Sequence, residues 1–240
     1  MDRFRGYAGT QTRNAPGRRW LTARRGAAAG GACLLALALT ALGTNTAQAA
    51  TDTFKVVFQD NDNVLAGYSN SGSSFTTTAA MTAGTGPSVA LLADSGYEAA
   101  FEASDDHLAV DQLGASATTT SLGMDPGTSP AIAALPGSGW IAAFQDNDNK
   151  LYLYDSKGDK INTDLGMDAG TSPAIAVQPD GSYKVVFQDN DNVLAGYNSS
   201  GSNYTTTVGM HPGTSPSISA ESNGSYEAAA EANTSDLATI

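Results

Sequence analysis

Between residues 127 and 168, short runs of apolar residues alternate with clusters of turn residues. The apolar runs are Pro130–Leu135, Trp140–Gln145, Leu151–Tyr154 and Ile161–Leu165. Short runs of β-branched and aromatic residues, bounded by Gly, Pro, Asn, Asp or Ser, are typical of strands. The pattern therefore predicts four antiparallel strands, and no stretch after residue 50 has a convincing helical period.

The same pattern returns every 43 residues. The tetrapeptide Gly-Thr-x-Pro starts units near residues 84, 127, 170 and 213, which follow a partial unit at 54–83. The segments Phe54–Tyr68 and Tyr183–Tyr197 are identical at fourteen of fifteen positions. Four strands per unit of this length are typical of a β-propeller blade. We therefore predict an all-β fold for residues 50–240, a β-propeller-like array of about four to five four-stranded antiparallel blades.

The side chains also predict how the blades pack. The first strand of each unit contains small residues, which fit where innermost strands crowd around an axis. The second strand is bulky, and Phe144 and Phe187 are expected to wedge between blades. Three strands, three complete units and three further strands make eighteen. The ring is then an imperfect five-bladed one, is open, or is completed by another chain. Because open edges invite pairing, a homo-oligomer is expected.

The first 49 residues do not belong to the array. Seven arginines lie between Arg3 and Arg25, an apolar run covers Ala32–Leu42, and small residues lead to Ala49. A charged region, a short apolar region and an Ala-x-Ala site are the parts of a secretory signal peptide. The apolar run is too short to span a membrane. We therefore predict a signal peptide at 1–49, cleavage near Ala49, and a secreted protein of bacterial origin.

The chain after Ala49 is strongly acidic. Its five lysines and 23 acidic residues leave a net charge of −18, and it contains neither arginine nor cysteine. Nucleic acids and anionic membranes attract cationic surfaces, so the charge argues against both as partners. The lack of cysteine excludes disulfides and thiol chemistry. These features favour a soluble extracellular protein.

Two phrases of the repeat resemble a known family. They are Gly-Met-Asp-Pro-Gly-Thr-Ser-Pro-Ala-Ile-Ala at 123–133 and Gly-Ser-Tyr-Lys-Val-Val-Phe-Gln-Asp-Asn at 181–190. They resemble a repeat family of secreted actinobacterial proteins, which is similar to tectonin-like and PLL-type lectin β-propellers. The resemblance covers residues 54–240 and implies sugar binding in pockets between blades. The family's third-strand Trp is replaced near Gly67, Val110, Leu153 and Gly196, and the Arg-dependent site of fucose lectin propellers has no arginine here.

The loops after the second strands carry Asp-Asn-Asp-Asn at 60–63, 146–149 and 189–192. We expect these DNDN turns at the same edge as the Met-x-x-Gly-Thr linkers between units. Planar polar groups beside an aromatic ring suit a sugar ligand. We therefore predict a lectin-like protein that binds glycans. The candidate ligand-binding residues are Asp60, Asp62, Trp140, Asp146, Asp148, Tyr152, Asp189, Asp191 and Tyr197.

Other interpretations of the same edge remain open. Asp and Asn favour hairpin turns, so the DNDN segments can be purely structural. Their oxygens also suit calcium, which would make a calcium-dependent adhesin, although the spaced Gly and bidentate Glu of an EF-hand loop are missing. The third alternative is a protein-binding or structural surface module.

Catalysis is not expected. His107 and His211 hold different positions of the repeat, and no nucleophile elbow, metalloprotease helix or phosphate loop is present in the sequence. The sequence therefore predicts neither an enzyme nor a bound metal or cofactor. Gln59, Gln145 and Gln188 are expected to satisfy buried backbone groups rather than to contact a ligand.

Overall fold

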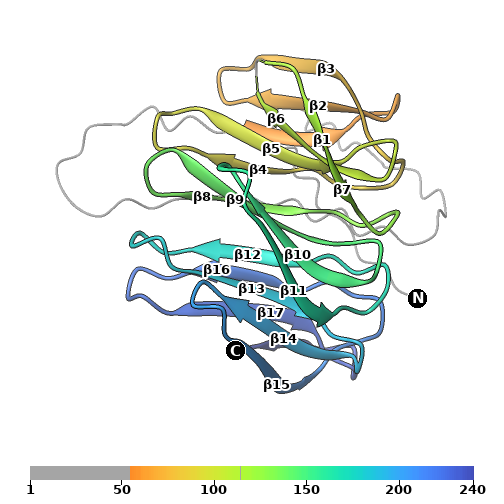
Figure 1. Cartoon of the computed structure of the whole chain (residues 1–240), viewed down its shortest axis with the longest axis vertical. Coiled ribbons are helices and arrows are strands. Elements are labelled where there is room, and N and C mark those ends of the chain that lie inside the picture. Colours follow the sequence, from red (N-terminus) through yellow and green to blue (C-terminus); the bar gives the residue numbers. More distant parts are fainter. Residues whose placement is uncertain (1–54, 114) are drawn as a thin grey trace, which may run out of the picture. The chain divides into compact units, whose positions relative to one another are not determined.

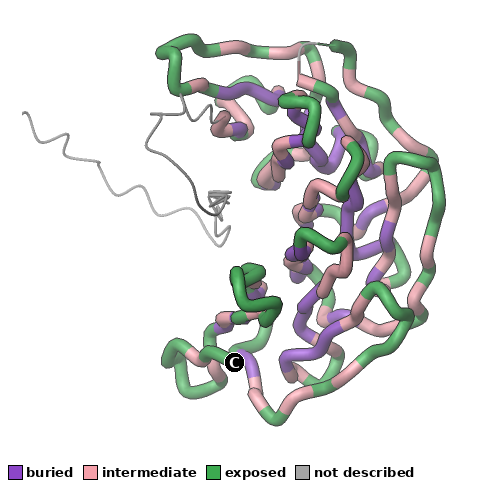
Figure 2. The backbone as a smooth tube through the Cα atoms, turned by 90° about the vertical axis from the view of Figure 1, so that its left-hand side faces the viewer, coloured by how far each residue is buried: buried purple, intermediate pink, exposed green. Residues whose placement is uncertain are grey.

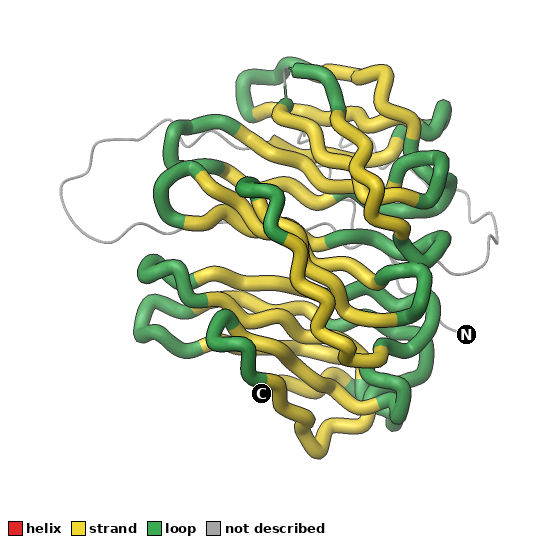
Figure 3. The backbone as a smooth tube through the Cα atoms, in the orientation of Figure 1, coloured by secondary structure: helices red, strands yellow, loops and turns green. Residues whose placement is uncertain are grey.

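The structure is a computed structural model that describes residues 55–113 and 115–240. Within these residues, eighteen strands form five antiparallel sheets, and no helix is present (Figure 1, Figure 3). The predicted all-β class, the strand count and the four-stranded unit are therefore confirmed. The predicted signal peptide at 1–49 lies outside the described residues.

The sheets follow one another along the chain, and each is a meander. The first holds β1 (Lys55–Gln59), β2 (Val64–Ser69) and β3 (Ser74–Ala80). The second holds β4 (Ser88–Leu91), β5 (Tyr97–Glu102), β6 (His107–Gln112) and β7 (Thr118–Gly123). The third holds β8 (Ala131–Leu135), β9 (Gly139–Gln145), β10 (Lys150–Asp155) and β11 (Lys160–Gly166). The fourth holds β12 (Ala174–Val177), β13 (Tyr183–Gln188), β14 (Val193–Asn198) and β15 (Asn203–Gly209). The fifth holds β16 (Ser217–Ala220), β17 (Tyr226–Glu231) and β18 (Leu237–Thr239).

The first strands of successive units lie against each other, as their small side chains predicted. β4 contacts β8, β8 contacts β12, and β12 contacts β16. Serines of the Gly-Thr-Ser-Pro linkers connect the units at this inner side. Ser172 Oγ accepts a hydrogen bond from Ser129 N at 2.9 Å, and Ser215 Oγ accepts one from Ser172 N at 2.9 Å. The repeated Ser therefore joins one unit to the next.

The linkers themselves are tight turns. Thr128 Oγ1 donates a hydrogen bond to the carbonyl of Asp125 at 2.7 Å, and Thr171 Oγ1 makes the same bond to Asp168. Gly127 has a φ of +87°, a backbone conformation that glycine adopts without strain. The tetrapeptide is thus a structural element of the repeat, which explains its strict spacing.

The hydrophobic core lies between neighbouring sheets. Phe101, Phe144 and Phe187 are at most 2% exposed, and each packs against the sheet that precedes it. Phe58, at the same repeat position, is 39% exposed because the described chain has no sheet before β1–β3. Figure 2 shows buried residues along the strands and exposed ones at the turns, and it shows that the sheets form an arc that does not close.

The described residues contain no helix that is long and apolar enough to cross a membrane.

Candidate functional site

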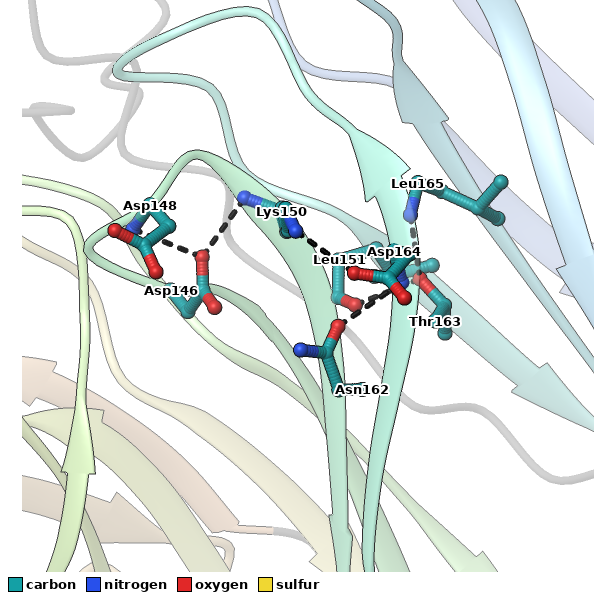
Figure 4. Close-up of polar contacts among 8 residues, drawn as sticks. All are labelled: Asp146, Asp148, Lys150, Leu151, Asn162, Thr163, Asp164 and Leu165. Carbon is teal, nitrogen blue, oxygen red and sulfur yellow. Dashed lines mark hydrogen bonds and ion pairs between the residues drawn. The ribbon is translucent and has the colours of Figure 1, made fainter.

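The DNDN turns are closed by their own first aspartate. Asp146 Oδ1 accepts hydrogen bonds from the backbone N–H groups of Asp148, at 3.0 Å, and Lys150, at 2.8 Å (Figure 4). Asp60 and Asp189 make the same pair of bonds in their turns. The structural interpretation of DNDN therefore holds for the first Asp, whose side chain replaces missing backbone partners.

The backbone conformation at the fourth position of each turn explains why this residue is Asn. Asn63, Asn149 and Asn192 have φ values of 56°, 57° and 58°, in the left-handed region that Asn tolerates better than most residues. The third residues, Asp62, Asp148 and Asp191, are exposed and lie at one edge of their sheets. A ligand could reach these three carboxylates and also the second residues of the turns, Asn61, Asn147 and Asn190, which are exposed as well.

The linkers lie beside the DNDN turns, as predicted. Met124 forms a β-bridge with Asp146, and Met167 forms one with Asp189. Buried glutamines tie the two together. Gln145 Nε2 donates to the carbonyl of Asp168 at 3.0 Å, while its Oε1 accepts from Gly170 N at 3.1 Å. Gln59 and Gln188 bond the following linkers in the same way, so the predicted backbone role of these glutamines is confirmed.

The second sheet has a glutamate at this position. Glu102 is fully buried, and both of its carboxylate oxygens accept from Gly127 N, at 3.2 and 3.1 Å. In its ionised form, Glu102 cannot donate the second hydrogen bond that the glutamines make. The pKa of Glu102 is raised from 4.5 to about 7, mainly because the group is buried; the hydrogen bond from Gly127 N–H opposes this rise, and the charge of Asp106 adds to it.

The structure separates two of the three predicted aromatic residues, Trp140 and Tyr197, from the DNDN turns. Tyr152 pairs with Phe144, and their rings lie 5.5 Å apart near the DNDN end of the third sheet. Trp140 lies near the start of β9, and Tyr197 lies near the end of β14. Both positions are at the strand ends opposite to the turns. The nine predicted residues therefore do not form one site.

Trp140 and Tyr197 instead belong to a second repeated feature, which we call the junction rings. Each of the four junctions between successive sheets holds two aromatic side chains at the strand ends opposite to the DNDN turns. The pairs are Phe75 with Tyr97, Trp140 with Tyr154, Tyr183 with Tyr197, and Tyr204 with Tyr226. Most of these rings are only partly buried, so they present aromatic surface at regular intervals.

Two of the junctions add a lysine. Lys55 Nζ lies 4.8 Å from the centroid of Tyr97 and 5.7 Å from that of Phe75. Lys184 Nζ lies 5.0 Å from Tyr226 and 5.6 Å from Tyr204. These distances are within the range of cation–π attraction. The lysines therefore bridge the first two sheets and the last two.

Glycine makes room for the rings at these two junctions. A Cβ atom at Gly67 would collide with the Phe75 ring, and one at Gly196 would collide with the Tyr204 ring. The equivalent residues of the second and third sheets are Val110 and Leu153, which stand opposite Thr118 and Ile161. The third strand of a unit thus has glycine where an aromatic ring comes from the fourth strand.

The junction between the first two sheets also contains a pocket of about 410 Å³, which we call the Asp111 pocket. Its walls include Phe75, Ala79, Leu113 and Lys55. Asp111 is 1% exposed, and neither of its carboxylate oxygens has a hydrogen-bond partner. Burial raises the pKa of Asp111 above its ordinary value, and Asp111 in turn helps burial to raise the pKa of Glu98 to about 7.

Within the described residues, no three His, Cys, Asp or Glu side chains come together as a metal site. Lys150 and Asp164 form an exposed ion pair of 2.7 Å across β10 and β11 (Figure 4).

Sequence reasoning missed Lys55, Phe75, Tyr97 and Asp111. A signal for Asp111 was present, because the residues 43 positions apart in this series are Tyr68, Asp111, Tyr154 and Tyr197. The series ends with Ile240, and Asp111 is its one acidic residue, with Tyr in the units on either side. Such a break in an otherwise regular repeat marks a position where one unit differs in chemistry from the others.

We compared the chain with known proteins to identify its fold. No family model matches the chain, and no curated protein matches it. The fucose-specific lectin from Aleuria aurantia is similar in structure, with a TM-score of 0.59 and 16% identity over 78% of this chain and 69% of the lectin. AofleA from Arthrobotrys oligospora has a TM-score of 0.56 and 11% identity over 78% of this chain and 64% of its own.

A streptogramin B lyase has a TM-score of 0.51 and 13% identity over 78% of this chain and 64% of the lyase. The Aleuria aurantia lectin is a six-bladed β-propeller. At these identities the comparisons establish the β-propeller fold, in an open form here, and the same architecture serves both lectins and a lyase.

Proposed function

We propose that this chain is a secreted, non-catalytic, lectin-like protein that binds carbohydrate at the junctions between its sheets. The observation that carries the proposal is the repetition of an aromatic pair at all four junctions, with at least one partly exposed ring in each pair. The fold similarity to the fucose-specific lectin from Aleuria aurantia supports it.

The chemistry of the junctions suits a sugar. Aromatic rings pack against the apolar C–H face of a pyranose, and neighbouring charged or hydroxyl groups bond its hydroxyls. Lys55 and Lys184 provide donors beside two of the ring pairs. The exposed aspartates of the DNDN turns stay predicted contacts at the other end of the sheets, with Asp62, Asp148 and Asp191 as their acceptors.

A glycan array tests the proposal. The purified chain should bind at least one class of glycan, and the signal should be unchanged by EDTA. Loss of the signal in EDTA would support the calcium-dependent adhesin instead. The absence of any glycan signal at high chain concentration would contradict the proposed function and favour a protein-binding surface.

Contribution of the DNDN turns can be measured on the same array. Asp148→Ala and Asp191→Ala remove the exposed carboxylates and leave the turn-closing Asp146 and Asp189 in place. If both turns contact the ligand, each substitution should lower avidity for a dense glycan surface, because several weak sites act together. The melting temperature should not change. Equal binding by parent and variants would assign DNDN to the turn alone.

Association of the chain stays a prediction. The first sheet leaves Phe58 39% exposed, and the fifth leaves Leu237 77% exposed. Within the array, the residues equivalent to these two are buried against neighbouring sheets. We expect light scattering to detect a homo-oligomer at micromolar concentration, and a monomer at every concentration would contradict this.

A further inference from the structure

We infer that the Asp111 pocket is the primary carbohydrate site of this chain, that it occurs once per chain, and that it takes a neutral sugar through a pair of adjacent hydroxyls. The inference rests on the proposed function and deepens it, because it selects one of the four junctions.

Asp111 has an unpaired carboxylate inside the folded chain. The carboxylate is almost completely buried, and both oxygens lack a hydrogen-bond partner. Such a group destabilises a folded chain, because it has lost its hydrogen bonds to water and has formed none to the protein. Buried polar groups without partners are rare in proteins and call for an explanation. A ligand that donates two hydrogen bonds into the pocket supplies one.

The second step is the shape of the pocket. Residues of β3, among them Phe75, Thr77 and Ala79, line the pocket together with residues that follow β6, among them Leu113, Ser116 and Ala117. Asp111 and Lys55 line the same space, so the lining combines apolar, hydroxyl and charged groups. A ring of carbon atoms edged with hydroxyls fits such a pocket. Its C–H face would contact Phe75, and its hydroxyls would face Asp111.

The third step is the ligand class. Two adjacent hydroxyls can donate to the two oxygens of one carboxylate, while Lys55 donates to an oxygen of the same sugar. An acidic sugar would bring a second carboxylate toward Asp111 in a chain that carries an excess of acidic groups. It would be repelled. A neutral pyranose with adjacent hydroxyls is therefore the ligand that can donate hydrogen bonds to Asp111 and accept one from Lys55 without bringing in a second negative charge.

The fourth step is the difference between junctions. The position of Asp111 is occupied by Tyr154 and Tyr197 at the next two junctions and by Ile240 at the last. The junction of Lys184, Tyr204 and Tyr226 repeats the lysine and both rings but has no carboxylate at this place. The complete combination of ring, lysine and buried acid thus exists once among the described residues.

Isothermal titration calorimetry with the methyl glycosides of L-fucose, D-galactose and D-mannose tests the inference. At least one should bind with a stoichiometry of one per chain. Asp111→Asn should weaken that binding by about 10-fold to 100-fold, the loss expected when a charged hydrogen-bond partner is removed. Asp94→Asn, the same change at an exposed position of the second sheet, should bind like the parent.

Thermal unfolding of the same variants distinguishes a loss of binding at the pocket from a loss of folding. Asp111→Asn and Asp111→Tyr both remove an unpaired buried charge, and the second restores the residue of the neighbouring units. Both should raise the melting temperature while they weaken binding. A merely structural Asp111 would not combine these two effects. Loss of binding together with a lower melting temperature would overturn the inference.

The outcomes separate the inference from the proposed function. If the parent binds a glycoside and Asp111→Asn binds it equally well, or if the stoichiometry approaches four, the pocket is not the primary site but the lectin-like function stands. If the parent binds no glycoside and no glycan on the array, both fail. Equal binding of methyl glucuronoside and the neutral glycosides would overturn the assignment of ligand class.

Discussion

Replacing Phe144 or Phe187 with alanine is expected to lower the free energy of unfolding by about 3–5 kcal/mol, the usual cost of removing a buried aromatic side chain. Phe144 is fully buried and Phe187 is 2% exposed, and each fills the space between two sheets. The cavity that alanine leaves cannot collapse easily, because the strands on both sides are held by hydrogen bonds. Urea unfolding of parent and variants measures the difference.

Phe58 provides a matched control for this prediction. It holds the same repeat position in the first sheet but is 39% exposed. Phe58→Ala should therefore cost about 1 kcal/mol or less, since little packing is lost. If all three variants lose similar stability, burial between sheets is not the reason, and the assignment of the inward face of the second strands would be wrong.

Replacing Glu102 with glutamine is expected to remove a pH-dependent loss of stability. In the folded chain the pKa of Glu102 is raised from 4.5 to about 7, first by burial and then by Asp106. The unfolded chain therefore releases this proton at lower pH than the folded chain does. Stability falls as the pH rises from about 4.5 to about 7, and the loss is complete above that range, at about 3 kcal/mol for this shift.

The glutamine variant should unfold like the parent at pH 4 and should be more stable by about 2–3 kcal/mol at pH 8. It can donate to the carbonyl of Asp125 as Gln145 donates to that of Asp168. Glu98 has a raised pKa in the same range, so part of the pH dependence will remain. Glu231→Gln is the control, because Glu231 holds the equivalent position in the fifth sheet and is exposed.

The opposite outcome would contradict the raised pKa of Glu102. If Glu102→Gln and Glu231→Gln show the same small effect at pH 8, Glu102 does not carry a buried proton, and its contact with Gly127 is strong enough to hold the charged form.

The repeat explains why the fold could be predicted so closely. The turn residues that bound each strand recur every 43 positions. A strand whose bounds are ambiguous in one unit can therefore be placed from the equivalent segments of the other units. The predicted run Trp140–Gln145 became β9 at Gly139–Gln145, and Leu151–Tyr154 became β10 at Lys150–Asp155. The exposure of Phe58 could not be predicted from spacing, because it depends on which sheet lies beside it.

The candidate site was harder for a physical reason. The DNDN turns are easily noticed in the sequence, but Asp146 recurs there because its side chain closes the turn, which is a structural role. The aromatic residues Trp140 and Tyr197 were predicted beside these turns, yet they lie at the opposite strand ends. The contacts that build the Asp111 pocket join residues from two sheets, and no local pattern reports such a contact. The available signal was Asp111, the one acidic residue at a repeat position that is Tyr in the units on either side of it.

A crystal structure of the chain grown with a neutral methyl glycoside tests the central claim most directly, because it shows where a sugar binds. The account predicts one sugar per chain at the junction of β3 and β6, with its ring against Phe75 and two of its hydroxyls on Asp111. Sugars at the DNDN turns with an empty Asp111 pocket, or no bound sugar at saturating concentration, would contradict it.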